Sequence, residues 1–211
     1  DGATAEQVGP GQALFPAAAY HGDYVIELAK GWNGSGDLRA FAIHEIQEEQ
    51  KADLAALGVV FDGHMSEKSL HENGQVVEVL QAFQPHAYQA LQPKQADGEA
   101  PEGAELAWFL ETSKWGDDKD RVTVKADGSV TYFVPDVAYH LNKWARGWAR
   151  AINIQGADHH GTLARVQAGV QAVNPSIGPG YPHVIFHTMI KVMKDGQPVK
   201  ASKRAGGYVT A

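Results

Sequence analysis

Residues 151–173, AINIQGADHHGTLARVQAGVQAV, and residues 183–187, HVIFH, give the clearest indication of how this chain folds. Residues 151–155 have the length and composition of a short strand, and so does HVIFH. A helix is predicted between them, over about 161–173. A strand, a helix and a second strand in this order favour two parallel strands joined by a helical crossover. The chain is therefore predicted to have an α/β fold.

Hydrophobic spacing and turn residues predict the remaining elements on either side of this unit. Further helices are expected at 24–30, 37–57, 66–83 with a break at Asn73-Gly74, and 135–144. Further strands are expected at 59–61, 106–112, 121–125 and 129–134, with a hairpin turn at Asp127-Gly128 and another tight turn at Asp195-Gly196. These elements predict three regions: a tail over 1–36 with one short helix, an α/β domain over 37–84 and 130–211, and a β-hairpin insertion over 85–129.

Composition places the chain among ordinary globular proteins. It has 211 residues, of which 44% are hydrophobic and 20% are charged, and a formal net charge of −7. The acidic balance excludes a general basic coat for nucleic acid, so DNA is not an expected partner. The absence of cysteine excludes disulfides and thiolate sites. No apolar run is long enough to span a membrane, so a cytoplasmic protein is expected. Its abrupt ends suggest a fragment.

A basic segment near the end of the chain is the first candidate for chemistry. Residues 200–204, KASKR, place three cations and one hydroxyl within five positions. Lys200, Ser202 and Lys203 could stabilise the negative charge that develops on a transferring phosphate. The alternative interpretation is an exposed basic turn.

The segment GADHHG, residues 156–161, is the second candidate because it joins a predicted strand to a helix. Ligands in parallel sheets bind beyond the carboxyl ends of strands, and the helix start favours anionic groups. Asp158 could accept hydrogen bonds from ribose hydroxyls. An alternative is the Asp-His-His metal site of a phosphoesterase, with further carboxylates nominated at Asp117, Asp118 and Asp120. A simple helix cap with packed histidines is the third interpretation.

The third candidate lies at the predicted start of the helix over 135–144. Asp136, Tyr139, His140 and Lys143 recur at spacings of three and four, so they share one helix face. A carboxylate flanked by aromatic rings could hold a guanidinium or ammonium group. The alternative is helix capping by Asp136. The charged run at 115–121, WGDDKDR, is interpreted as a turn ordered by ion pairs.

Four segments together resemble bacterial-type arginyl-tRNA synthetases, which are class I enzymes. The resemblance covers residues 54–210. Its most specific segments are LGVVFDGHMSEKSLHENGQV, TSKWGDDKDRVTVKADGSVTYFVPDVAYHLNKWARG, INIQGADHHG and DGQPVKASKRAGGYVT. The first 50 or so residues resemble the preceding region of the family less distinctly.

This resemblance implies a Rossmann-type catalytic domain that activates L-arginine with ATP and transfers it to arginine tRNA. Mg²⁺ is expected only as part of the ATP complex, with no resident metal, and the protein is expected to be a monomer. By the resemblance, Lys200, Ser202 and Lys203 belong to the KMSKS loop, which stabilises the phosphates. Tyr132 and Asp136 belong to the arginine pocket, and Tyr139 lies one turn further on. Gly156 and Asp158 belong to the segment that borders the ATP ribose, with His159 and His160 beside them.

The chain departs from the family pattern in three ways. Ala201 stands where the KMSKS loop usually has Met, the HIGH signature is absent, and the anticodon-binding domain does not follow. The nearest short stretch to HIGH, His21-Gly22-Asp23, lacks the second histidine. Because the two signature loops act together on the phosphates, the chain alone is expected to be inactive. Two alternatives remain: a non-catalytic module that binds arginine or a nucleotide, and the metallophosphoesterase.

Overall fold

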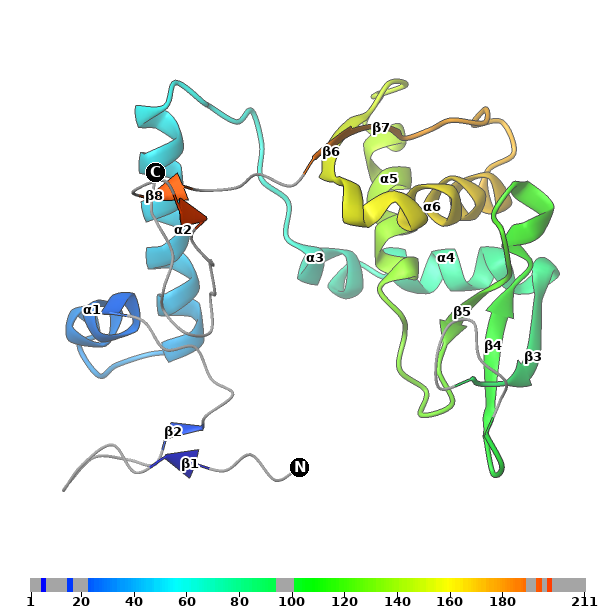
Figure 1. Ribbon diagram of the computed structural model, residues 1–211, viewed down its shortest axis with the longest axis horizontal. Coiled ribbons are helices and arrows are strands. Elements are labelled where there is room, and N and C mark those ends of the chain that lie inside the picture. Colours follow the sequence, from blue (N-terminus) through cyan, green and yellow to red (C-terminus); the bar gives the residue numbers. More distant parts are fainter. Residues whose placement is uncertain are drawn as a thin grey trace. The chain divides into compact units, whose positions relative to one another are not determined.

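The computed structural model describes residues 5–6, 15–16, 23–93, 101–188, 193–194 and 197–198. The chain divides into two compact units, one formed by 1–63 with 190–211 and the other by 64–189 (Figure 1). The boundary after Gly63 falls inside the range 37–84 that the sequence assigned to one domain. The domain limits drawn from the sequence stay a prediction.

In its described residues, the first unit contains two helices and two short strand pairs. Helix α1 covers Asp23–Gly31 and helix α2 covers Leu38–Ala56. Asp37 begins α2 as predicted, because its carboxylate accepts hydrogen bonds from the backbone N–H groups of Arg39 at 2.8 Å and Ala40 at 3.3 Å. The antiparallel strand pairs are β1 Ala5–Glu6 with β2 Phe15–Pro16, and β8 Met193–Lys194 with β9 Gln197–Pro198. The turn predicted at Asp195-Gly196 lies outside the described residues.

The strand predicted at 59–61 is wrong. Val59, Val60 and Phe61 are 41%, 81% and 55% exposed and form no strand. Gly58 ends the preceding helix with a φ of +76°, and the N–H of Val59 bonds back to the carbonyl of Leu54. Residues 59–61 therefore follow the C-terminus of α2 as a loop, and no strand pairs with them among the described residues.

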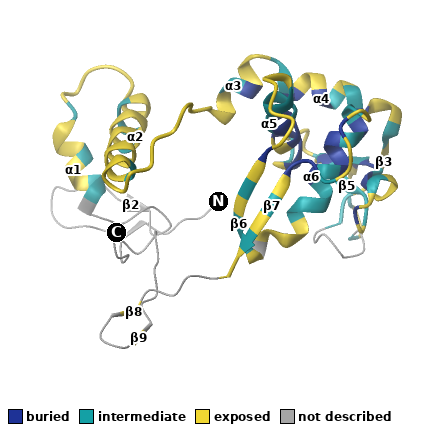
Figure 2. Cartoon of the chain, turned by 90° about the horizontal axis from the view of Figure 1, so that it is seen from above, coloured by how far each residue is buried: buried dark blue, intermediate teal, exposed yellow. Residues whose placement is uncertain are grey.

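Four helices form the core of the second unit. They are α3 Glu67–Glu72, α4 Gln75–Phe83, α5 Phe133–Ala145 and α6 His160–Val173. The predicted break at Asn73-Gly74 is confirmed, because Gly74 has a φ of +77° between α3 and α4. Figure 2 shows that burial concentrates in this unit, where the largest fully buried apolar side chains are Phe83, Leu70, Leu110, Ile177, Val134, Val137 and Val170.

The predicted strand–helix–strand unit is confirmed. Strands β6 Ile152–Gly156 and β7 His183–His187 pair in parallel, with Ile152 opposite His183 and Gly156 opposite His187, and α6 connects them. Side chains alternate between an intermediate and an exposed face along both strands. Asn153 and Gln155 lie on the face that meets α5 and α6. The α/β class is therefore confirmed.

The predicted β-hairpin region contains a larger sheet than expected. Strands β3 Ala87–Leu91, β4 Leu106–Leu110 and β5 Arg121–Val124 form an antiparallel sheet in the order β3-β4-β5. The segment 84–104 is polar and contains three prolines, so the sequence predicts a surface loop there and no strand over 87–91. Stacking of Tyr88 on Phe109, with ring centroids 5.6 Å apart, stabilises that strand across the sheet.

The strand predicted at 129–134 is also wrong. The Asp127-Gly128 turn forms, but beyond it only Val130 makes an isolated bridge, to Val124. The hydroxyl of Thr131 turns inward and donates to the carbonyl of Val122 at 2.7 Å. Helix α5 begins at Phe133, two residues before the predicted position, and absorbs the rest of the run.

Three short 3₁₀ helices complete the unit: η1 Gln84–His86, η2 Thr112–Trp115 and η3 Ala157–His159. In the part of the chain that the structure describes, no helix is both long enough and apolar enough to cross a membrane.

Candidate functional site

The start of helix α5 places Asp136 beside a cavity of about 210 Å³. Asp136 lies in the first turn of the helix and Tyr139 lies one turn further on. Both line the cavity, and the other lining residues are Met65, Glu67, Leu70 and Pro135. The structure thus brings two of the three predicted arginine-pocket residues together. Tyr132, the third, is 84% exposed and does not line this cavity.

The charges around this cavity suit a cationic ligand. Desolvation raises the pKa of Asp136, and the nearby carboxylate of Glu67 raises it further. The positive charges of Arg165 and His159 act in the opposite direction but do not outweigh them. Two carboxylates therefore face a cavity whose lining residues include no cation. A bound guanidinium or ammonium group would relieve their repulsion.

Glu67 is a candidate that the sequence analysis missed. It lies in the first turn of α3, where an acidic residue also stabilises the helix dipole, so its position in the sequence suggested nothing more. Its second role depends on the packing of α3 beside α5, which brings it to the same cavity as Asp136. No local sequence signal reports that contact.

Asp136 also lines a second, smaller cavity. It measures about 40 Å³ and its polar lining residues are Asp136, His140, Asn153, Gln155 and Thr162. Three of the surrounding side chains form a chain of hydrogen bonds. Lys143 Nζ lies 3.2 Å from Asn153 Oδ1, and Asn153 Nδ2 lies 3.2 Å from His140 Nε2. Lys143 also lies 4.1 Å above the centroid of the Tyr139 ring, within cation–π range.

The predicted ATP-ribose segment lies at the carboxyl end of the parallel pair. Strand β6 ends at Gly156, η3 follows, and α6 begins at His160. The His160 ring stacks on Phe186 of β7 with ring centroids 3.7 Å apart, so part of its role is packing. The side chain of Asp158 is outside the described parts of the structure, and so are Lys200, Ser202 and Lys203.

The charged run at 115–121 forms the ion-paired turn that the sequence predicted. Arg121 donates from Nε to Asp117 Oδ2 and from a terminal nitrogen to Asp117 Oδ1, both at 2.7 Å. Burial would raise the pKa of Asp117, but the hydrogen bonds from Arg121 and Asp118 together with the positive charge of Arg121 outweigh that effect and hold the pKa below its usual value. Both carboxylate oxygens of Asp117 are thus engaged by Arg121. Among the described residues no group of three or more potential ligands could hold a metal ion.

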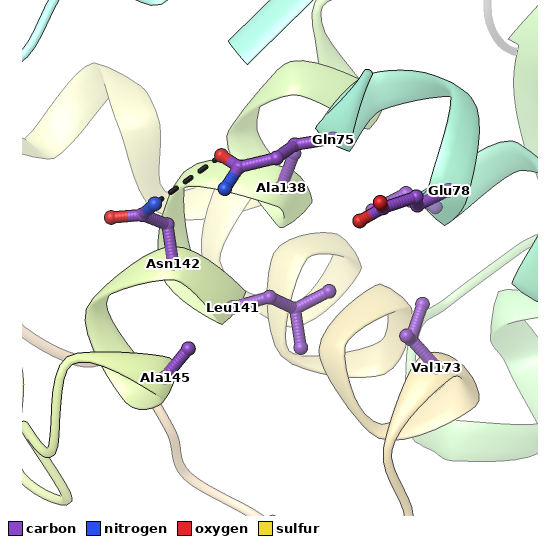
Figure 3. Close-up of a pocket in the computed structure, with 8 residues that line it drawn as sticks. Gln75, Glu78, Ala138, Leu141, Asn142, Ala145 and Val173 are labelled. Carbon is purple, nitrogen blue, oxygen red and sulfur yellow. Dashed lines mark hydrogen bonds between the residues drawn. The ribbon is translucent and has the colours of Figure 1, made fainter. Parts of the chain in front are cut away.

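A further cavity of about 180 Å³ lies on another face of α5, bounded by α4 and α6 (Figure 3). Its floor is largely apolar, with Leu141 and Val173 facing it, and Glu78 lies at one side. The Asn142 amide nitrogen donates to Gln75 Oε1 at 3.2 Å (Figure 3). None of the residues predicted to carry chemistry lines this cavity.

Sequence comparison relates the whole chain to one group of enzymes. It is 45% identical over 227 aligned residues to an arginine–tRNA ligase of Thiobacillus denitrificans, and 44% identical to one of Polaromonas naphthalenivorans. Each alignment covers 99% of this chain. This chain matches one part of the arginine–tRNA ligases. It spans about two fifths of the length of these curated ligases, namely 39% and 38%. No protein-family model matches the chain.

Structural comparison agrees with the ligase match. A crystal structure from Campylobacter jejuni, described as an arginyl-tRNA synthetase, superposes with a TM-score of 0.67 and 27% identity. That match covers 90% of this chain and 41% of the other. The arginyl-tRNA synthetase of Thermus thermophilus gives a TM-score of 0.52 over 72% of this chain and 31% of the other. At 16% identity, the second match supports the fold alone.

Proposed function

We propose that this chain is the arginine-binding part of an ATP-dependent arginine–tRNA ligase. The observation that carries the proposal is the cavity where Asp136, Glu67 and Tyr139 meet. A guanidinium pairs with carboxylates and can pack against aromatic rings, and two carboxylates and one tyrosine line this cavity. The sequence identity to arginine–tRNA ligases supports the same conclusion.

Asp136 is the primary partner of the substrate cation in this proposal. Its desolvated carboxylate can accept two parallel N–H donors from the guanidinium, and Glu67 adds a second negative charge. Met65, Leu70 and Pro135 form an apolar wall suited to the substrate methylenes. Tyr132 is exposed and directly precedes α5, and its ring is proposed to close over the ligand.

The ATP part of the proposal rests on the carboxyl end of β6. Gly156 permits close approach of a ribose, and the first turn of α6 offers backbone N–H groups at the positive end of the helix dipole. Asp158, His159 and His160 are proposed to border that ribose. Mg²⁺ is proposed to enter bound to the ATP phosphates, where it would neutralise part of their charge.

The proposed reaction has two balanced steps. The arginine carboxylate attacks the α-phosphorus of ATP, the bond to the β-phosphate oxygen breaks, and pyrophosphate leaves. A terminal ribose hydroxyl of the tRNA then attacks the adenylate carbonyl carbon and gives its proton to water, the bond from that carbon to the phosphate oxygen breaks, and AMP leaves. Lys200, Ser202 and Lys203 are proposed to stabilise charge on the leaving pyrophosphate.

Calorimetric titration of the chain with L-arginine tests the binding proposal, with L-citrulline as the uncharged isostere. Asp136→Asn is expected to weaken arginine binding by about tenfold to a hundredfold, because it removes a charge-assisted bidentate contact worth ~1.5–3 kcal/mol. Glu72→Gln is the matched control, since it removes one carboxylate from α3 that does not line the cavity. Equal binding of citrulline and arginine would contradict the proposal.

ATP–pyrophosphate exchange tests the chemical step. The chain alone is expected to exchange pyrophosphate far more slowly than the Thiobacillus denitrificans ligase. In a longer protein that contains this chain, Lys203→Ala is expected to lower the exchange rate by roughly a hundredfold or more while arginine affinity stays unchanged. Selective arginine binding without exchange in that longer protein would instead support the non-catalytic module.

A further inference from the structure

The hydrogen bonds around Asn153 determine the protonation of His140. A lysine ammonium has only donors, so the atom of Asn153 that faces Lys143 at 3.2 Å must be the amide oxygen. The Asn153 amide nitrogen then faces His140 Nε2 at 3.2 Å and donates to it. Nε2 is therefore an acceptor, and a neutral ring with an acceptor at Nε2 carries its proton on Nδ1.

The environment of the ring keeps it neutral and in place. Burial, and then the charge of Lys143, lower the pKa of His140 to about 4. The Tyr181 ring meets the imidazole edge-on with centroids 6.4 Å apart, and the Tyr181 hydroxyl donates to the His140 carbonyl at 3.2 Å. The ring is thus a rigid, neutral donor at physiological pH.

The Nδ1–H of His140 has no hydrogen-bond partner among the described residues, although His140 is only 6% exposed. A buried donor without a partner costs about 1–3 kcal/mol, so such groups are normally satisfied by protein or by ordered water. His140 lines the cavity of about 40 Å³ that Asp136 also lines. That volume holds one water molecule, and polar groups of Gln155 and Thr162 are available to bind it.

We propose that His140 is a positioning residue for Asp136: its Nδ1–H donates to one water in this cavity, and that water donates to the Asp136 carboxylate. The water takes one lone pair of the carboxylate and fixes its orientation, and both oxygens keep a lone pair that can accept from the guanidinium. The inference rests on the proposed arginine site. A guanidinium has only donors, so His140 acts on it through Asp136 and not by direct contact.

The relay runs from Lys143 through Asn153 and His140 to Asp136, and it joins helix α5 to strand β6. Other charges that act on Asp136 come from Glu67 on α3, Arg165 on α6 and His159 on η3. None of these charges is altered when His140 is replaced by a neutral side chain. Because desolvation is the largest influence on the pKa of Asp136, the difference between two buried amide replacements of His140, and not the effect of either one alone, reports the hydrogen bond.

Two substitutions separate the two ring nitrogens. His140→Asn places an amide donor at the level of Nδ1 and loses the acceptor at Nε2. His140→Gln places an amide oxygen near Nε2, keeps the contact with Asn153, and loses the donor toward Asp136. Carbon-13 NMR of labelled chain would follow the Asp136 carboxyl through its titration, and calorimetry would follow L-arginine binding.

His140→Gln is expected to raise the pKa of Asp136 by about one unit and to weaken arginine binding by about tenfold, because the ionised carboxylate loses a donor. His140→Asn is expected to leave the pKa within about 0.3 units and the affinity within about threefold of the wild-type chain. Equal effects of the two substitutions on the Asp136 pKa would overturn the proposal.

Nitrogen-15 NMR of the unaltered chain gives a test that requires no variant. The expected result is a neutral ring protonated at Nδ1, and protonation at Nε2 would overturn the relay. The outcomes also separate the two proposals. If the chain does not select arginine but the Asp136 titration follows the predicted pattern, only the proposed function fails. If arginine binds through Asp136 and the two His140 variants behave alike, only the role of His140 fails.

Discussion

The carboxylate of Asp117 has a structural role, because both of its oxygens accept hydrogen bonds from Arg121. Asp117 has a side chain only 1% exposed, and that of Arg121 is 13% exposed. A buried pair of this kind is costly to desolvate, and its two parallel hydrogen bonds offset that cost. Breaking the pair takes from Arg121 its buried carboxylate partner and leaves it the exposed carboxylate of Asp118, so the pair with Asp117 is the one that holds the turn between η2 and β5.

Asp117→Asn is expected to lower the free energy of unfolding by about 1.5–3 kcal/mol at pH 7, because Arg121 loses its charge-assisted hydrogen bonds to a buried carboxylate and keeps the ion pair with exposed Asp118. Urea denaturation monitored by tryptophan fluorescence would measure the loss. Because folding lowers the pKa of Asp117, its contribution is present above the unfolded pKa and is lost as the pH falls through the folded value. The difference from wild type should therefore shrink in acid, and a difference that grew there would contradict this assignment.

His140 makes a second pH-dependent contribution, in a different range. Its folded pKa of about 4 lies below the usual histidine value of 6.5, so the unfolded chain binds more protons between these values. The contribution of His140 to the free energy of unfolding is therefore present above pH 6.5 and is lost as the pH falls toward 4. Between pH 7 and pH 4.5, wild-type chain is expected to lose about 2–3 kcal/mol relative to His140→Asn. Parallel stability profiles for the two proteins in this range would refute the prediction.

Helices α5 and α6 approach closely at a glycine. A Cβ atom on Gly169 would lie 2.5 Å from Val137 Cγ2 and 2.8 Å from the Phe133 ring, distances that real side chains do not tolerate. Phe133 and Val137 lie on one face of α5, one turn apart. Their side chains fill the space that a side chain at position 169 would occupy. This close contact packs α5, which carries Asp136, against α6, which follows the predicted ATP-ribose segment.

Gly169→Ala is expected to destabilise the chain by about 1–3 kcal/mol, since overpacking outweighs the ~1 kcal/mol that alanine gains in helix propensity. Gly161→Ala in the same helix is the matched control. A Cβ atom there meets nothing within 4 Å, so that substitution is expected to be neutral or stabilising. Thermal melts of both variants would measure the effect, and equal melting temperatures would show that α5 and α6 are less closely packed.

For the molecule as a whole, the two compact units are joined through exposed chain. Every residue from Leu57 to Lys68 is exposed, and the division falls after Gly63. The second unit carries the buried core and both cavities that Asp136 lines.

The parallel strand pair β6–β7 leaves Ile152, Ile154 and Ile185 exposed at 49%, 73% and 55% on one face, although parallel sheets are usually covered on both faces.

Brief digestion with chymotrypsin is expected to cut first after Leu57 or Phe61, because these side chains are exposed beside the boundary. Phe83 and Leu110 serve as internal controls, since both are fully buried in the second unit. Mass spectrometry of the products would locate the cuts. Early cleavage after Phe83 or Leu110 would show that the second unit does not fold as a stable core.

Local signals in the sequence were sufficient for the elements whose patterns are self-contained. The helix start at Asp37, the break at Gly74 and the strand–helix–strand unit of β6, α6 and β7 all formed as predicted, because capping and positive φ are properties of neighbouring residues. The grouping of Asp136, Tyr139 and His140 followed from helical spacing alone.

Contacts between distant segments decided the rest. Strand β3 exists through its pairing with β4, and the apolar run at 59–61 stays exposed because no strand pairs with it among the described residues. Glu67 reaches Asp136 only because α3 packs beside α5, and the tautomer of His140 depends on Asn153 from β6. Burial and pairing depend on what the fold brings opposite a residue, and a local pattern carries no information about that partner.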